Sequence, residues 1–277
     1  MAVRVLVKRE DLNHPFISGN KWWKLKYNLE EAKALNCDTL LTFGGAYSNH
    51  IYATAAAAKE GGFKCIGIIR GEKVQPLNST LAFAESCGMK LHYVSREAYR
   101  QKIESSFIQN LQDQFGNFFL IPEGGTNELA VKGVAEFALL LIEETEFDYL
   151  CLPVGTGGTM AGIVVQLAGK KKIIGYSALK GGSFLNNEIK KFGGDAFSNW
   201  RIEEAYHFGG YAKTDKVLGD FMKDAEGKHH LLLDQVYTGK MLFGVFDQIN
   251  KGLFNKGSTI LVLHTGGLRG RIKLEDN

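Results

Sequence analysis

The sequence lacks most of the features that would place it outside the ordinary globular class. Its 277 residues include only four prolines, and no apolar run reaches the roughly 18 residues that a membrane-spanning helix needs. The formal net charge of +3 is too small to indicate nucleic acid or an anionic membrane as a partner. Because 45% of the residues are hydrophobic, the chain has ample material for one large domain or two moderate ones.

The four cysteines form no Cys-x-x-Cys pair. Cys65 and Cys151 lie inside apolar, strand-like runs, where cysteine acts as a small hydrophobic residue. This usage is typical of a reduced, intracellular protein rather than a disulfide scaffold. The first residues, MAVRVLVKREDL, become charged before the apolar region of a signal peptide could form. We therefore expect a soluble cytoplasmic protein. We expect no metal either, because the only double histidine, His229-His230, has no further ligands at metal-binding spacing.

Short apolar runs alternate with helical patterns along the chain, which predicts βα units and parallel sheets. We expect an α/β protein with two parallel-sheet lobes. The predicted strands cover residues 38–43, 64–70, 90–95, 117–122, 148–154, 171–178 and 258–264. The predicted helices cover residues 48–60, 79–88, 101–114, 133–144, 155–168 and 239–254.

In such sheets ligands bind beyond the carboxyl ends of the strands. Four loops fall there: GGAYSNH, PEGGTN, VGTGGT and HTGG. The segment 155–159, GTGGT, follows a strand and opens a helix, where glycines and unpaired N–H groups suit a phosphate. A dinucleotide is disfavoured, because Met160 stands where the third glycine of the GxGxxG pattern belongs. This loop alone also permits a glycine turn without a ligand.

The other loops are each ambiguous alone. Ser48 suits a helix N-cap, which would by itself satisfy the hydroxyl. Asn49 and His50 have no such reason to be polar ahead of an apolar helix, and amides and hydroxyls at a helix N-terminus also suit a carboxylate. Tyr237 is either a core ring or a phenol at a site. Thr265, at the end of a buried strand, would point into the cleft.

Together these motifs resemble a specific family. In order, GNK, GG-x-x-SNH, PEGGTN, GTGGTxAG, VYTGK and HTGG look like the 1-aminocyclopropane-1-carboxylate (ACC) deaminase/D-cysteine desulfhydrase family, from about Val5 to Gly267. The resemblance implies pyridoxal 5'-phosphate as cofactor and the tryptophan synthase β-like fold (fold type II) with two open, twisted parallel sheets. It also implies a homodimer, a larger cofactor-binding domain of residues 1–30 plus 136–277, and a smaller α/β domain of residues 31–135.

The resemblance also assigns roles to residues. Lys21 of GNK would form the Schiff base, Ser48 would lie at the substrate carboxylate and reacting centre, and Tyr237 would lie against the cofactor near the substrate. The other cofactor-binding residues would be Lys24, Asn49, Gly155, Thr156, Gly157, Gly158, Thr159 and Thr265. The substrate-binding residues would be Ser48, Asn49, His50, Tyr211 and Thr238.

The stretch SGNKWWKLKY puts Lys21 on a glycine turn beside two large rings. A snorkelling lysine at a helix start is the simple interpretation. If Lys21 forms an imine it must be neutral, and burial lowers a lysine pKa because it disfavours the charged form. We expect Trp22 and Trp23 to supply that wall, with one ring in the core and the other toward a partner or solvent.

Two threonines bear on the substrate. Deaminases of the family carry glutamate and leucine where this chain has Thr238 and Thr265. A threonine hydroxyl suits a neutral pyridine nitrogen and hence a substrate with its own leaving group. We therefore expect β-elimination from D-cysteine, giving pyruvate, ammonia and sulfide, in a lyase or hydrolase class. The alternatives are ACC deamination, another small substrate such as D-serine or a chlorinated alanine, a serine/threonine dehydratase or cysteine synthase, a non-catalytic cofactor-binding homologue, and a Rossmann nucleotide-binding protein.

Overall fold

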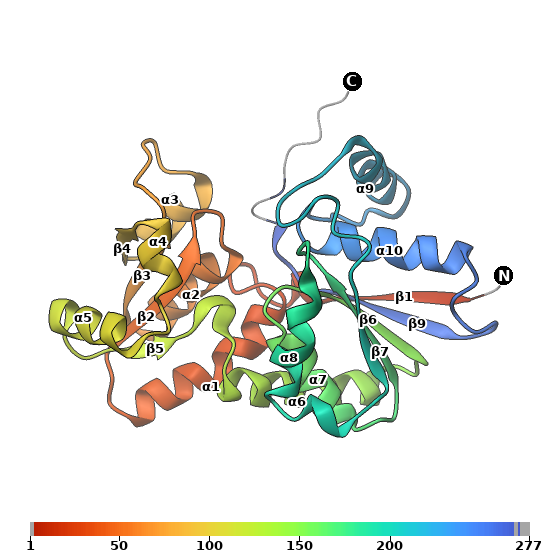
Figure 1. The fold of residues 1–277 in the computed structure, drawn as a ribbon, viewed down its shortest axis with the longest axis horizontal. Coiled ribbons are helices and arrows are strands. Elements are labelled where there is room, and N and C mark those ends of the chain that lie inside the picture. Colours follow the sequence, from red (N-terminus) through yellow and green to blue (C-terminus); the bar gives the residue numbers. More distant parts are fainter. Residues whose placement is uncertain (1–2, 269–270, 272–277) are drawn as a thin grey trace.

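The computed structural model describes residues 3–268 and 271. It contains two sheets, a five-stranded one in the order β1-β9-β6-β7-β8 and a four-stranded one in the order β4-β3-β2-β5. All strand pairs in both sheets are parallel. Figure 1 shows the smaller sheet with its helices on the left and the larger sheet on the right. The predicted α/β class with two parallel-sheet lobes is confirmed.

The elements follow one another as the alternating pattern predicts. The strands are β1 (Arg4–Arg9), β2 (Thr39–Gly45), β3 (Lys64–Arg70), β4 (Met89–Val94), β5 (Phe119–Ile121), β6 (Tyr149–Val154), β7 (Lys172–Ser177), β8 (Trp200–Glu203) and β9 (Thr259–His264). The helices are α1 (Asn20–Ala34), α2 (Asn49–Gly61), α3 (Ser79–Ser86), α4 (Arg96–Arg100), α5 (Ser105–Phe115), α6 (Glu128–Glu144), α7 (Gly158–Leu167), α8 (Leu185–Lys190), α9 (Lys216–His229) and α10 (Thr238–Asn250). Among the described residues, no helix is long and apolar enough to cross a membrane.

The larger sheet is covered on both faces. Along β6, Leu150 and Leu152 pack with α6 and α7, while Tyr149 and Cys151 pack with α9 and α10 on the opposite face. Successive strand residues point to opposite faces, so a strand covered on both sides must be apolar throughout. This is why the continuous run DYLCLPV gave a clear strand signal.

Six elements have no range in the sequence prediction: β1, β8, α1, α4, α8 and α9. β1 and β8 are the two edge strands of the larger sheet, and most of their residues are only partly buried. An edge strand needs no continuous apolar run, so the signal used for the central strands is absent there. Among the helices, α9 buries only Leu218, Met222 and Ala225, spaced three or four residues apart in an otherwise polar segment.

Two helices connect the lobes. The predicted domain boundaries, after residues 30 and 135, fall inside α1 and α6, which pack against each other. The four strands of the smaller sheet lie within residues 31–135, and the boundaries themselves stay a prediction. The indole of Trp23 stacks on Phe137 of α6 at 5.1 Å, and its Nε1 donates to Glu10 Oε2 at 2.7 Å.

The two helices approach closely because α6 has a glycine at the contact. A Cβ placed on Gly133 would overlap the carbonyl oxygen of Trp23, two residues beyond the lysine of the GNK turn. The position of α1, and with it the start of the site, therefore depends on this glycine.

We expect Gly133→Ala to destabilise the protein by about 1–3 kcal/mol, since overpacking at a close contact forces the backbone to move. Gly227→Ala in α9 is the matched control, because a Cβ there meets nothing within 4 Å. That control should be neutral or stabilising by up to about 1 kcal/mol, as usual for glycine in a helix. Urea unfolding of both variants measures the difference, and equal stabilities would contradict the packing argument.

Candidate active site

The loops after β2, β5, β6 and β9 meet between the lobes. A Cβ built on Gly267, after β9, would lie 2.5 Å from Nδ2 of Asn49, after β2. A Cβ built on Gly158, after β6, would lie 2.7 Å from Cγ2 of Thr126, after β5. The four loops singled out in the sequence therefore form one junction, at the edge where parallel sheets bind ligands.

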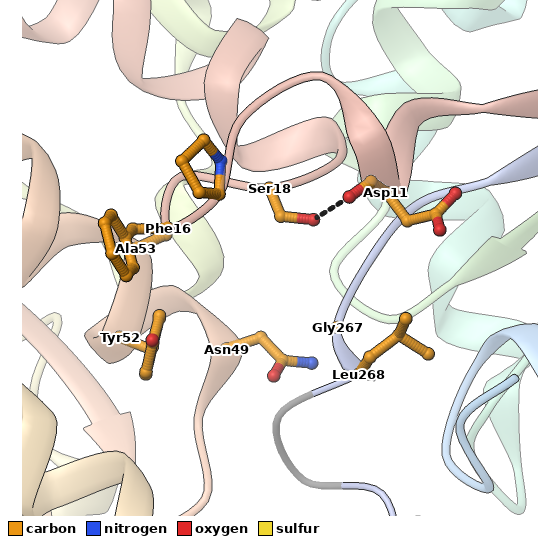
Figure 2. A pocket seen from close by; sticks show the side chains of 9 residues that line it. Asp11, Phe16, Ser18, Asn49, Tyr52, Ala53, Gly267 and Leu268 are labelled. Atoms are coloured by element: carbon orange, nitrogen blue, oxygen red, sulfur yellow. Dashed lines mark hydrogen bonds between the residues drawn. The ribbon is translucent and has the colours of Figure 1, made fainter. Parts of the chain in front are cut away.

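A cavity of about 250 Å³ lies beside this junction, and Figure 2 shows its lining. The side chain of Asn49 faces it from the first turn of α2, and the hydroxyl of Ser18 donates to the backbone oxygen of Asp11 at 3.1 Å. The lining residues are Asp11, Pro15, Phe16, Ser18, Asn49, Tyr52, Ala53, Gly267 and Leu268. The cavity brings together Ser18, which directly precedes the GNK turn, Asn49 of the SNH loop and Gly267 of the terminal motif.

Lys21 lies in the first turn of α1, and its Nζ donates to Oδ1 of Asn20 at 3.0 Å. Burial lowers the pKa of Lys21 to about 8, in the direction that the sequence predicts.

The tryptophans do not form the expected wall. Trp22 stacks on His14 at 5.1 Å and stays 40% exposed, while Trp23 joins the core. Successive side chains leave a helix about 100° apart, so three neighbours point in different directions. The expectation of one ring in the core and one toward solvent is correct, but neither ring stacks over Lys21.

Lys24, one turn after Lys21, is 2% exposed. Its Nζ donates to the Gly124 oxygen at 2.5 Å and to Oγ1 of Thr126 at 2.8 Å. Burial, and then the charge of Lys21, lower the pKa of Lys24 well below its ordinary value. Among residues 3–268 and 271, no carboxylate forms an ion pair with either lysine.

The glycine loop stands opposite these lysines. Gly157 adopts φ 83°, which glycine tolerates best, and α7 begins directly after it. Thr159 accepts a hydrogen bond from Nδ2 of Asn20 at 2.8 Å, and Thr156 pairs with Thr126 at 2.6 Å. The start of α7 is thereby tied both to the GNK turn and to the loop after β5.

This arrangement fits pyridoxal phosphate. Burial lowers the pKa of both lysines, and the charge of Lys21 lowers that of Lys24 further, so a nearby anion would stabilise the pair. The first N–H groups of a helix supply further donors to a phosphate. A Cβ on Gly155 would lie 3.0 Å from Cε1 of Tyr237. A side chain at position 155 would therefore fill the space between the glycine loop and the Tyr237 ring. Lys21, with its lowered pKa, would react with the aldehyde, and Lys24 and the loop Gly155–Thr159 would bind the phosphate; these roles stay predictions.

Two predicted substrate ligands are engaged elsewhere. His50 is 2% exposed, its Nε2 lies 2.7 Å from Oγ1 of Thr42, and its Nδ1 lies 3.4 Å from Oγ1 of Thr54. Because Thr42 donates its own proton to the Ile121 oxygen at 2.7 Å, His50 donates through Nε2 and carries no proton on Nδ1. Burial, and then Lys21 and Lys24, lower the pKa of His50. A neutral, buried histidine with both nitrogens engaged holds the loops together, and its contact with a substrate stays a prediction.

Thr238 is the second of these. It is fully buried, and its hydroxyl donates to Oδ2 of Asp234 at 2.7 Å while accepting from the Asp234 N–H at 3.0 Å. The same carboxylate accepts from the backbone N–H groups of Val236, Tyr237 and Thr238. Asp234 thus caps the start of α10, and Thr238 has no proton left for a substrate.

Ser48 and Asn49 remain available. Ser48 caps α2 by accepting from the Ile51 N–H at 3.3 Å, which uses an acceptor and leaves the hydroxyl proton free. In the part of the chain that the structure describes, the Asn49 side chain makes no hydrogen bond. Both side chains retain donors at the junction.

Tyr237 and Tyr211 form a pair with ring centroids 6.0 Å apart at 73°. Burial, and then the neighbouring phenol of Tyr211, raise the pKa of Tyr237 well above its ordinary value. Tyr237 therefore stays protonated at neutral pH and acts as a donor. Tyr211 is 45% exposed and closes the pair on the solvent side.

Thr265 lies against the GNK turn. Its carbonyl oxygen accepts from the Asn20 N–H at 3.3 Å, and a Cβ on Gly19 would overlap that oxygen. Its side chain makes no hydrogen bond within the described residues, although only 8% of the residue is exposed. This hydroxyl is free for a ligand.

Sequence reasoning missed the residues that hold the others in place. Asn20 and Thr126 were inside quoted motifs, so the signal was present but carried no role. Lys240, at the end of the VYTGK motif, also carried no role, because its partners are backbone oxygens at His207 and Gly210. Asp234 lay outside the motifs, and its partners are backbone N–H groups within the next four residues.

The junction defines a pyridoxal-phosphate site, and the chain matches the family model of pyridoxal-phosphate-dependent enzymes over residues 1–266. The protein belongs to that family. It is 31% identical to a putative ACC deaminase of Pyrococcus abyssi, over 98% of this chain and 86% of that protein. It is 29% identical to a mitochondrial bifunctional D-cysteine desulfhydrase/ACC deaminase of Arabidopsis thaliana, over 95% and 72%. The crystal structure of an ACC deaminase homologue superposes with a TM-score of 0.81 at 28% identity, over 96% and 85%. The predicted family, fold and cofactor are confirmed.

We expect pyridoxal phosphate, added to cofactor-free protein and trapped with borohydride, to label Lys21. The yield should rise as the pH passes about 8, where the amine loses its proton. An ordinary lysine would need a pH of about 10.4. Peptide mass spectrometry locates the adduct, and Lys21→Arg serves as the blank. Labelling at Lys24, or a midpoint typical of exposed lysines, would refute this assignment.

Proposed function

We propose that the protein is a lyase that converts D-cysteine and water to pyruvate, ammonia and hydrogen sulfide. Its homology to ACC deaminases and D-cysteine desulfhydrases is established above. The observation that supports this substrate is the free hydroxyl of Thr265, which is buried at the junction without a hydrogen-bond partner among the described residues. Pyridoxal phosphate, when bound, withdraws electrons from the bonds at the substrate Cα.

The group facing the ring nitrogen sets how strongly it does so. A carboxylate there would keep a proton on the nitrogen, whereas the hydroxyl of Thr265, the residue we assign to that place, would donate to a neutral nitrogen. Thr238 does not compete for that role, because Asp234 holds it. A weaker pull on electrons suits a substrate whose Cβ already carries a leaving group, such as the thiol of D-cysteine.

Three side chains then divide the proton movements. Lys21, with its pKa lowered to about 8, suits removal of the Cα proton, since a base works best near its own pKa. Tyr237 stays protonated and can donate to the sulfur as its bond to Cβ breaks. Ser48, with its hydroxyl proton free at the start of α2, can donate to the substrate carboxylate.

The reaction class is that of a lyase, because the Cβ–S bond breaks by elimination; the hydrolase class also expected from the sequence does not fit. ACC deamination is the second candidate, favoured by the names of the Pyrococcus and Arabidopsis relatives. That the protein is a homodimer and works in the cytoplasm is also proposed, by resemblance and by its cysteine usage. The name of the Arabidopsis relative places that protein in mitochondria.

The test is pyruvate release by cofactor-saturated enzyme with D-cysteine and ACC side by side, with Lys21→Ala as the blank. We expect release from D-cysteine. Thr265→Leu should lower kcat/KM for D-cysteine roughly 2- to 10-fold, the effect of losing about 0.5–1.5 kcal/mol from one hydrogen bond between neutral groups. It should also raise the preference for ACC relative to D-cysteine.

Thr214→Leu, at an exposed threonine, is the control. We change position 265 alone and leave Thr238 in place, because a glutamate at position 238 would be buried against Asp234. Release from ACC alone by the unaltered enzyme would overturn the role of Thr265. Cofactor binding without turnover of either compound would favour the non-catalytic alternative.

A further inference from the structure

Lys240 is a buried lysine outside the cofactor junction. It lies in the first turn of α10 and is 1% exposed. Its Nζ donates to the backbone oxygens of His207 at 2.8 Å and Gly210 at 2.7 Å. Both acceptors belong to one loop, 30 and more residues earlier in the chain.

A lysine in this position needs an explanation. Burial lowers the pKa of Lys240 to about 8, against the attraction of Asp234, so most molecules still carry the charge at neutral pH. A buried ammonium group costs several kcal/mol unless other groups replace the lost water. Asp234 directs its oxygens to the start of α10 instead. The charge of Lys240 is therefore directed at the two loop carbonyls.

The loop that it binds has an unusual backbone. Phe208, Gly209, Gly210 and Ala212 have φ values of 50°, 87°, 120° and 56°. Left-handed conformations are unfavourable for residues other than glycine, such as Phe208 and Ala212. Internal bonds exist, such as the Gly210 N–H to the His207 oxygen at 3.0 Å, but they stay within the loop. Lys240 joins the loop to α10.

The same loop carries Tyr211, whose ring lies edge-on to Tyr237, 6.0 Å between centroids. Tyr237 itself is held by Asp234, through its backbone N–H at 2.8 Å. Two buried charges thus flank the start of α10. Asp234, just before the helix, holds Tyr237, and Lys240, in the first turn, holds the loop of Tyr211.

We propose that Lys240 is a positioning residue that holds Tyr211 against Tyr237, through the carbonyl oxygens of His207 and Gly210. In the role proposed above, Tyr237 donates a proton to the leaving sulfur, and Tyr211 limits water around it and orients its hydroxyl. The link to catalysis rests on that proposed function. The link between Lys240 and the loop does not.

The first test is hydrogen exchange of the cofactor-saturated enzyme without substrate. In Lys240→Met, amides of residues 207–213 should exchange roughly tenfold faster or more, because the loop opens more often once its bonds to α10 are lost. Lys240→Arg, which keeps charge and donors, should restore part of the protection. Lys216→Met, at an exposed lysine paired with Asp220, should change nothing in the loop. Unchanged exchange in Lys240→Met would overturn the proposal.

The second test asks whether Lys240 acts through Tyr211. The single variants Lys240→Met and Tyr211→Phe should each lower kcat/KM, and the double variant should resemble Tyr211→Phe alone. Both should affect kcat more than KM. Multiplied losses in the double variant would mean that Lys240 acts on the fold in general, and would refute the positioning role.

The two tests also separate this proposal from the choice of substrate. If neither D-cysteine nor ACC is turned over, the proposed function fails, while the exchange result still decides whether Lys240 holds the loop. If Lys240→Met does not fold, as judged by circular dichroism, Lys240→Arg carries the exchange test, with a smaller increase expected because a planar guanidinium cannot reproduce both bonds. No increase in that variant would then refute the proposal.

Discussion

The site depends on two lysine ammonium groups brought into one buried junction without a carboxylate to neutralise them. Lys21 and Lys24 leave the same face of α1, and each loses solvation there. Burial of these two lysines raises the free energy of the folded protein without ligand, and an anionic ligand with an aldehyde lowers that free energy in two ways. Its phosphate supplies the missing negative charge, and reaction with Lys21 removes a buried amine that is already inclined to be neutral. Affinity for the cofactor is therefore stored in the folded protein as unfavourable electrostatics.

The groups around these lysines are arranged to carry no competing charge. His50 is neutral because it is buried beside two cations, and Tyr237 is protonated because it is buried beside another phenol. Thr126, Thr156 and Thr265 offer hydroxyls. The carboxylate of Asp234 accepts from backbone N–H groups and from Thr238. Because most groups around the anionic ligand are neutral donors, few side chains can remove or deliver a proton during the reaction.

Much of this was readable from the sequence, and the reason differs from part to part. Central strands such as β6 were predictable because both faces are covered, whereas the edge strands β1 and β8 gave too weak a pattern. Loops at strand ends gave the location of the site, and the order of six motifs gave its chemistry. The hydrogen bond from Thr238 to Asp234 was not predictable. The spacing of the two residues does not show whether the Thr238 hydroxyl binds a ligand or a carboxylate four residues away. The directions of the Trp22 and Trp23 side chains could not be predicted without knowing where α6 lies, since Trp23 stacks on Phe137 of that helix. Lys240 stood inside the VYTGK motif, but its role was not predictable, because its acceptors are backbone carbonyl groups, which leave no trace in residue types.

The pairing of β1 with β9 sets the order in which the molecule can be completed during synthesis. Arg4 to Arg9 find their strand partners only at Thr259 to His264, and Asn20 finds its backbone acceptor at Thr265. The strands of the smaller sheet all lie between Thr39 and Ile121, so that sheet can form while the rest of the chain is still being made. Lys21 precedes the smaller sheet in the chain, yet the turn on which it stands is held by Thr265, which follows β9. The surroundings of Lys21 are therefore complete only after β9 has been made and has paired with β1.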